Sequence, residues 1–367
     1  MNLRQLICVN YIYLIILLTG CGDNNQSNQK VFHHNYSLES VANIILEESE
    51  GNYLGKCRGI RVDDNGCIYY GDASQVSVKV FHPDGRLKYS FGQQGKAPYE
   101  LDDINAFDIQ NNRAVFCKSG HTISIFDTCG KYINYFRVAD GSAPIGNSVN
   151  INPLNNNILL ASCSLAGGGN FSKLYKDSWI ISEYDSTGKF IKHFGKYCNY
   201  ILENELFHFR LVGFPIIHVD KKSRIYYCTD YIPIIQIYDS KGNQINEISV
   251  QSDLFIPIIN FKDSKQKRKV SFIWYICYLE EPNVLLIVFC NRHNETNNIQ
   301  YHINIYDFNN NTLVPDIDIT NIIKPNEILA HFCTDGRECI YILTDNTPDQ
   351  VTITKFKITK KGDIVLK

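Results

Sequence analysis

The chain has 367 residues, of which 44% are hydrophobic and 20% are charged, so it can bury a sizeable core. Its formal net charge of −2 gives no general electrostatic attraction to nucleic acid. Length alone would allow two domains, but no Pro/Ser-rich linker or block of charge divides residues 40 to 367. We therefore expect a single folded domain that does not bind nucleic acid.

The first residues have the pattern of a secretory signal. Arg4 is followed by the short apolar run Tyr11–Leu18, and Leu18-Thr19-Gly20-Cys21 closes the segment. The apolar run is shorter than the roughly 20 residues of a membrane span. The closing four residues resemble a bacterial lipobox, which implies cleavage before Cys21 and lipidation of its thiol. The alternative is an ordinary signal peptide with an incidental cysteine.

A polar segment follows, and its lack of apolar side chains from residue 22 to 30 predicts a flexible tether. We predict a lipoprotein signal peptide over residues 1–20, a tether over 21–36 and one domain over 37–367. The lipid would make the membrane a partner of the protein. It would place the domain in the cell envelope as an outer-membrane lipoprotein that faces the periplasm or the cell surface.

Alternation of apolar and polar residues with a period of two dominates the remaining chain, and long amphipathic helices are absent. The clearest unit spans residues 60 to 95 and contains four short strands joined by tight turns, which is the pattern of one propeller blade. The expected strands are Ile60–Val62, Ile68–Tyr70, Val76–Phe81 and Arg86–Phe91.

A short phrase recurs along the chain: an aromatic residue, Asp, two further residues and Gly. Such repetition indicates an array of similar supersecondary units. Clear copies are Phe126–Gly130, Tyr184–Gly188 and Tyr238–Gly242, with a variant at Phe81–Gly85 and a decayed copy at Tyr306–Asn310.

Six such units fit the chain, and the last of them lacks one strand. Val41–Leu46 could supply that strand, which would join the two ends of the domain and leave no bare sheet edge. We therefore predict an all-β fold, a six-bladed β-propeller of four-stranded antiparallel blades closed by the N- and C-terminal strands. A β-sandwich is the alternative.

The chain contains 13 cysteines without a regular pairing pattern. Because several lie within apolar strand-like runs, we expect buried free thiols rather than a disulfide framework. Zinc is not expected, since no CxxC motif has a second partner pair. We expect no cofactor, and neither calcium nor zinc has support in the sequence. The cysteines within apolar runs include Cys117, Cys163, Cys228, Cys277 and Cys290.

The segment Phe91–Leu101 follows the first unit and contains Gly92, Gly95, Pro98 and Glu100. It resembles the signature of the six-bladed β-propeller lipoproteins of Bacteroidetes, which are related to NHL-repeat propellers. The resemblance implies the fold and an envelope location. It does not imply an activity, because one fold supports many functions.

One position of the aligned inner strands is polar in most units. Inner strands surround the axis of a propeller, so these side chains could gather at the central channel. Cation, anion, amide and imidazole together would suit a polar small molecule, a sugar or a peptide terminus. A mutually satisfied structural network is the alternative. The residues at this position are Arg61, Asp108, Asn150 and His218, with Tyr278 and Cys333 as looser equivalents.

We predict a monomeric, lipid-anchored envelope module that binds a carbohydrate, a peptide or an envelope protein. The alternative is a metal-assisted hydrolase or lyase at the central channel, similar to the gluconolactonase-like family. We assign no catalytic residue, because the Glu-Gly-Pro segment of that family and a nucleophile-elbow serine are both missing from the sequence.

Overall fold

The computed structural model describes residues 36–48, 53–104, 106–118, 122–138, 144–162, 179–200, 214–256, 269–293, 298–323, 331–347 and 350–360. Cys21, the predicted signal peptide and residues 21–35 of the predicted tether lie outside these ranges. Within them, no helix is both long enough and apolar enough to cross a membrane.

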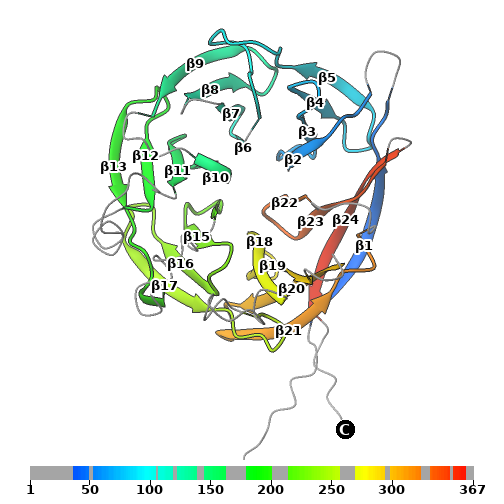
Figure 1. Ribbon diagram of the computed structural model, residues 1–367, viewed down its shortest axis with the longest axis vertical. Coiled ribbons are helices and arrows are strands. Elements are labelled where there is room, and N and C mark those ends of the chain that lie inside the picture. The colour runs from blue at the N-terminus through cyan, green and yellow to red at the C-terminus, as the bar shows by residue number, and fades with distance from the viewer. Residues whose placement is uncertain are drawn as a thin grey trace, which may run out of the picture. The chain divides into compact units, whose positions relative to one another are not determined.

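Six four-stranded antiparallel sheets surround a common axis (Figure 1). Each of the first five blades uses four consecutive strands, the first of them innermost. Blade 1 contains β2 (Cys57–Val62), β3 (Ile68–Asp72), β4 (Ser77–Phe81) and β5 (Leu87–Phe91); blade 2 contains β6 (Ala106–Gln110), β7 (Arg113–Lys118), β8 (Thr122–Asp127) and β9 (Tyr132–Arg137); blade 3 contains β10 (Pro144–Ile151), β11 (Ile158–Ser162), β12 (Ile181–Tyr184) and β13 (Phe190–Phe194).

The remaining three blades complete the ring, which confirms the predicted propeller and excludes the sandwich. Blade 4 contains β14 (Pro215–Val219), β15 (Ile225–Thr229), β16 (Ile234–Tyr238) and β17 (Gln244–Ser249); blade 5 contains β18 (Lys269–Leu279), β19 (Val284–His293), β20 (Asn298–Asp307) and β21 (Thr312–Asp318); blade 6 contains β22 (Phe332–Thr334), β23 (Cys339–Thr347), β24 (Gln350–Lys360) and β1 (Tyr36–Ile45).

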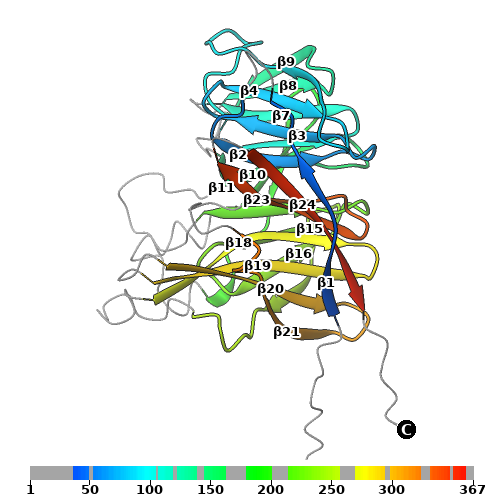
Figure 2. The ribbon, with the colours of Figure 1, turned by 90° about the vertical axis from the view of Figure 1, so that its right-hand side faces the viewer.

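Blade 6 joins the two ends of the domain. β1 pairs with β24 in antiparallel register from Tyr36 opposite Lys360 to Ile45 opposite Thr352, and Figure 2 shows the two strands side by side. The Tyr36 hydroxyl donates a hydrogen bond of 2.7 Å to Asp307 of blade 5. The predicted closure by the first and last strands is therefore confirmed.

The hydrophobic core lies between neighbouring blades. For example, Ile60 and Tyr70 of blade 1 pack with Leu343 and Ile353 of blade 6. The described residues form six clusters of this kind, each built from two adjacent blades. The apolar face of a blade is thus removed from water by its neighbour, as expected for an amphipathic sheet.

The recurring phrase forms the turn between the third and fourth strands of a blade. In blade 3, Asp185 Oδ1 accepts hydrogen bonds from the backbone N–H groups of Thr187 and Lys189, at 2.8 and 2.9 Å. Gly188 has φ +88°, and a Cβ on it would lie 2.4 Å from the ring of Phe136 in blade 2. Glycine is needed both for the backbone conformation and for contact between blades. Equivalent contacts are Gly130 against Phe91 and Gly242 against Phe194.

Ten cysteines in the described part of the chain carry free thiols, and all but the exposed Cys129 are buried. Burial raises the pKa of the thiols of Cys117, Cys228, Cys277 and Cys290. The prediction of buried free thiols is thus confirmed for four of the five cysteines named above, and Cys163 lies outside the described residues.

Candidate functional site

A cavity of about 80 Å³ lies at the axis and is lined by residues from the inner strands of all six blades. Four of the predicted site residues line it, each from a different blade. One water molecule needs about 10–15 Å³, so the cavity can hold several waters or the polar end of a larger ligand. These four residues are Arg61 on β2, Asp108 on β6, Asn150 on β10 and His218 on β14.

Tyr278 does not line this cavity, so its assignment to the channel was wrong, and Tyr275 of the same strand lines it instead. The Tyr278 side chain is 2% exposed and stacks on Tyr226 of blade 4, with ring centroids 5.9 Å apart. Its hydroxyl donates a 2.6 Å hydrogen bond to Asn283. A large aromatic ring gains more from packing between blades than a short polar side chain does.

Arg61 and Asp108 form an ion pair between blades 1 and 2, with 3.1 Å between Nε and Oδ1. Arg61 also donates to the carbonyl oxygen of Ile60 at 2.9 Å, and Asp108 Oδ2 accepts from the N–H of Ile151 in blade 3 at 2.9 Å. Burial raises the pKa of Asp108, and the charge of Arg61 partly opposes this rise. The Arg61–Asp108 pair therefore links blades 1, 2 and 3, and its two opposite charges compensate each other.

Asn150 and His218 differ from that pair because each has a polar atom without a partner. Asn150 Nδ2 donates to the carbonyl oxygen of Val149 at 2.7 Å, which leaves Oδ1 as an acceptor. Neither Asn150 Oδ1 nor His218 Nε2 has a hydrogen-bond partner among the described residues, and both atoms are buried. Burial lowers the pKa of His218 to about 4, so its imidazole is neutral at pH 7.

An ion pair crosses the mouth of the cavity. Lys221 follows β14 in blade 4, Asp64 follows β2 in blade 1, and 2.9 Å separates Nζ from Oδ1. Both residues line the cavity. Blades 1 and 4 face each other across the six-membered ring (Figure 1). We did not single out either residue from the sequence, although their opposite charges at equivalent turn positions were a usable signal.

No metal centre accompanies this arrangement in the described ranges. There, no group of three or more His, Cys, Asp or Glu side chains is placed to hold a metal ion. The site therefore offers hydrogen-bonding groups and charges rather than a cluster of metal ligands.

The segment Phe91–Leu101 connects blades 1 and 2 and folds back on itself. The Gly95 N–H donates to the Leu101 carbonyl oxygen at 2.9 Å, and the Leu101 N–H donates to Gln93 at 2.8 Å. The Ala97 N–H donates to the Glu100 carboxylate at 2.9 Å. The motif that carried the family resemblance is therefore a compact connection between blades, away from the cavity lining.

Comparisons with known proteins agree with this fold. Residues 23–149, about a third of the chain, match the profile of the DUF5128 family, described as a 6-bladed beta-propeller. A member of the DUF4221 family from Bacteroides vulgatus has a similar structure, with a TM-score of 0.65 and 12% identity over 89% of this chain and 99% of that one. No curated protein sequence matches the chain.

Two further solved structures are similar. A candidate exported protein from Bacteroides fragilis has a TM-score of 0.59 and 15% identity over 89% of this chain and 96% of that one. A catalytically inactive virginiamycin B lyase variant from Staphylococcus aureus has a TM-score of 0.49 and 12% identity over 88% and 99% of the two chains. Identities this low show similarity of fold alone. The chain is therefore a six-bladed β-propeller similar to the propeller proteins of Bacteroides, as its sequence predicted.

Proposed function

We propose that the protein is a lipid-anchored envelope module whose channel cavity binds the polar end of a small ligand. The supporting observation is that two buried atoms, Asn150 Oδ1 and His218 Nε2, have no hydrogen-bond partner among the described residues. A buried polar atom without a partner is costly, so a ligand that supplies one is stabilised there. The ion pair between Arg61 and Asp108 holds the wall of the cavity in place.

A hydroxyl group suits these two atoms. It can donate to the amide oxygen of Asn150, which is fixed as an acceptor by the bond from its own Nδ2 to Val149. It can also accept from, or donate to, Nε2 of the neutral His218 imidazole, because a nitrogen of a neutral imidazole is either a donor or an acceptor. Carbohydrates and polyols present such groups at high density, so we place the ligand in that class.

The N-terminal sequence supports the proposed location. Lipid on Cys21 would anchor the domain through the polar segment that precedes β1. A single acyl chain holds a protein only marginally, so stable anchoring requires more than one. The similarity to a candidate exported protein of Bacteroides fragilis supports an envelope location.

A glycan array probed with the chain from Lys30 onward tests the binding role. We expect a hydroxyl-rich glycan to bind, and Asn150→Leu and His218→Phe to weaken that binding by roughly tenfold each, the equivalent of one hydrogen bond. Binding that survives both substitutions unchanged would contradict the proposal. For the anchor, Cys21→Ser should abolish labelling by radioactive palmitate and release the protein from membranes.

A further inference from the structure

The residues that cross the cavity mouth occupy equivalent positions in their blades. Asp64 lies three residues after Arg61, and Lys221 lies three residues after His218. Each belongs to the turn between the first and second strands of its blade. The carboxylate oxygen Oδ1 of the preceding residue, Asp63 in blade 1, holds its turn through the backbone N–H groups of two later residues. The turns therefore place Asp64 and Lys221 at the mouth as parts of the fold.

Blade 6 has a glycine where the Lys221 side chain passes. Gly336 is the equivalent turn residue there, with φ +70°, and a Cβ on it would lie 3.1 Å from Lys221 Cε. The stem of Lys221 thus lies against the Gly336 backbone on its way to Asp64. We call the Lys221–Asp64 ion pair the crossbar.

Acceptors outnumber donors beneath the crossbar. The Asn150 side chain is 7% exposed and its Oδ1 has no partner among the described residues. Four carboxylates line the cavity, and three of them are matched by a cation. The fourth, Asp335, forms no ion pair with a described residue, and its Oδ1 accepts the backbone N–H groups of Arg337, Glu338 and Cys339. The matched pairs are Arg61–Asp108, Lys221–Asp64 and Arg224–Asp220.

We propose that Lys221 Nζ occupies the place of a ligand's primary ammonium group, and that the natural ligand is an amino sugar with a hydroxyl group beside the ammonium. This inference rests on the proposed binding role of the cavity and specifies its ligand. An ammonium in this place makes the contact with Asp64 that Lys221 makes at 2.9 Å, and the neighbouring hydroxyl group can donate to Asn150 Oδ1. Asp335 adds negative charge to the cavity wall.

The crossbar can open at low cost. The side chain of Asp64 is 58% exposed and that of Lys221 is 29% exposed. An ion pair this exposed contributes little to stability, because water competes for both charges. When Lys221 turns outward into solvent, its ammonium leaves Asp64 available to the ligand. The lysine therefore competes with the ligand from within the same chain.

Three two-carbon probes test the assignment, because they share a hydroxyl and differ only in charge: ethanolamine, ethylene glycol and glycolate. Their affinities for the full-length protein in detergent are measured by NMR titration at constant ionic strength. We expect Lys221→Met to bind ethanolamine roughly tenfold more tightly than the wild type, as removal of a competitor that is bound about nine-tenths of the time requires. Adding Asp64→Asn should abolish that gain.

Lys222→Met is the matched control, since this exposed lysine lies in the same turn but does not line the cavity. It should leave the affinity for ethanolamine unchanged. An equal gain in both lysine variants would show an effect of net charge and overturn the inference. So would equal affinity for the three probes, a preference for glycolate, or no binding of ethanolamine by Lys221→Met.

These outcomes remain separable from failure of the proposed function. If the three probes bind equally and Asn150→Leu weakens all of them, the cavity binds hydroxyl groups and only the ammonium assignment is wrong. If Asn150→Leu changes no affinity, the binding role of the cavity itself is wrong.

Discussion

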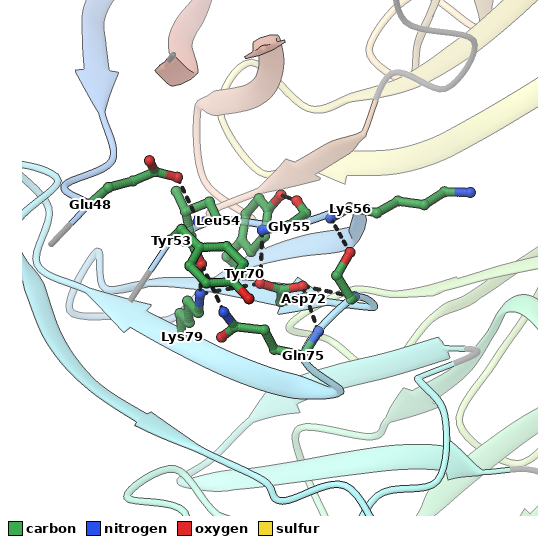
Figure 3. A network of polar contacts seen from close by, with 10 residues as sticks. Glu48, Tyr53, Leu54, Gly55, Lys56, Tyr70, Asp72, Gln75 and Lys79 are labelled. Carbon is green, nitrogen blue, oxygen red and sulfur yellow. Dashed lines mark hydrogen bonds and ion pairs between the residues drawn. The ribbon is translucent and has the colours of Figure 1, made fainter. Parts of the chain in front are cut away.

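Blade 1 borders two polar networks that differ in how completely their atoms are paired. The first is the ion pair between Asp72 and Lys79, with 3.2 Å between the charged atoms and almost no exposure of either side chain (Figure 3). Asp72 Oδ2 also accepts from the Gly55 N–H at 2.9 Å, and its Oδ1 accepts from the N–H groups of Ser74 and Gln75. Each carboxylate oxygen of Asp72 therefore has at least two partners.

The second network lines the channel, and some of its polar atoms have no hydrogen-bond partner among the described residues. Arg61 and Asp108 satisfy each other, but Asn150 Oδ1 and His218 Nε2 have no partner among the described residues. Full pairing makes a buried charge compatible with a stable fold, as Asp72 shows. Incomplete pairing beside a cavity costs stability that a bound polar group can recover. We infer that the first network holds the blade and the second serves binding.

The largest loss of stability is expected at Lys79, which belongs to the fully paired network. Lys79→Met would leave the Asp72 carboxylate buried without its cation and remove the hydrogen bond to the Tyr53 carbonyl oxygen. Loss of one partner from a buried pair costs about 3–5 kcal/mol, so the free energy of unfolding in urea should fall by that amount.

The control for Lys79 is Arg86→Met, because Arg86 pairs with Asp84 at 2.8 Å where both side chains are largely exposed. No measurable loss of stability is expected for this variant. If the two substitutions proved equally mild, the Asp72–Lys79 pair would not be a structural element of blade 1.

Substitutions at two glycines compare the tight packing between blades with the looser packing at the mouth of the cavity. Gly188→Ala requires the Ala side chain to overlap the ring of Phe136 and to adopt φ +88°, so we expect a loss of about 2–4 kcal/mol. Gly336→Ala has a similar φ of +70° but meets only the flexible end of Lys221, so about 1 kcal/mol is expected. Urea denaturation of both variants measures the difference, and equal losses would contradict the tight contact at Phe136.

Local signals in the sequence predicted the blades well. The alternation of apolar and polar residues located the strand that begins at Ile225. The Asp and Gly of the recurring phrase located the turns, because the Asp side chain bonds to backbone N–H groups only a few residues away. Ring closure followed from a strand missing from the last unit, for which Val41–Leu46 was a candidate. The observed β1 starts earlier, at Tyr36, since its first residues pair with the end of β24.

The site was less accessible to such reasoning. Register along the inner strands placed Arg61 and Asn150 at the channel, but whether each is satisfied depends on partners in other blades. Tyr278 was misplaced because the size of its ring, rather than its register, decides where it packs. The crossbar joins residues 157 positions apart, and no local pattern specifies that contact.

The pH dependence of stability tests whether His218 is buried in its neutral form. Its pKa is lowered to about 4, whereas an unfolded histidine takes up its proton near pH 6.5. The unfolded state therefore binds more protons between these values, and the contribution of His218 to stability should fall by about 2–3 kcal/mol as the pH drops from 6.5 to 4. Asp230, whose pKa burial raises to about 7, contributes a slope of the opposite sign over this range.

His331, whose pKa burial also lowers to about 4, adds a slope of the same sign as that of His218. The raised pKa of Asp108 acts in the opposite direction at the acid end, because the folded state takes up that proton more readily. Urea unfolding at several pH values, with His218→Gln beside the wild type, isolates the contribution of His218. A slope that is unchanged in the variant would contradict its burial as a neutral group.

The smallest expected change in stability carries the most information about the channel. Asn150→Leu removes the unpaired Oδ1 together with the hydrogen bond to Val149, so the free energy of unfolding should change by no more than about 1 kcal/mol. Asn304→Leu in blade 5 is the control, because the buried Asn304 also has an Oδ1 without a partner among the described residues but lies outside the cavity lining and donates to both Val314 and Asp316. That variant should lose stability and keep glycan binding, whereas Asn150→Leu should keep stability and lose binding. The reverse pattern would make Asn150 a structural residue and remove the main support for a binding cavity.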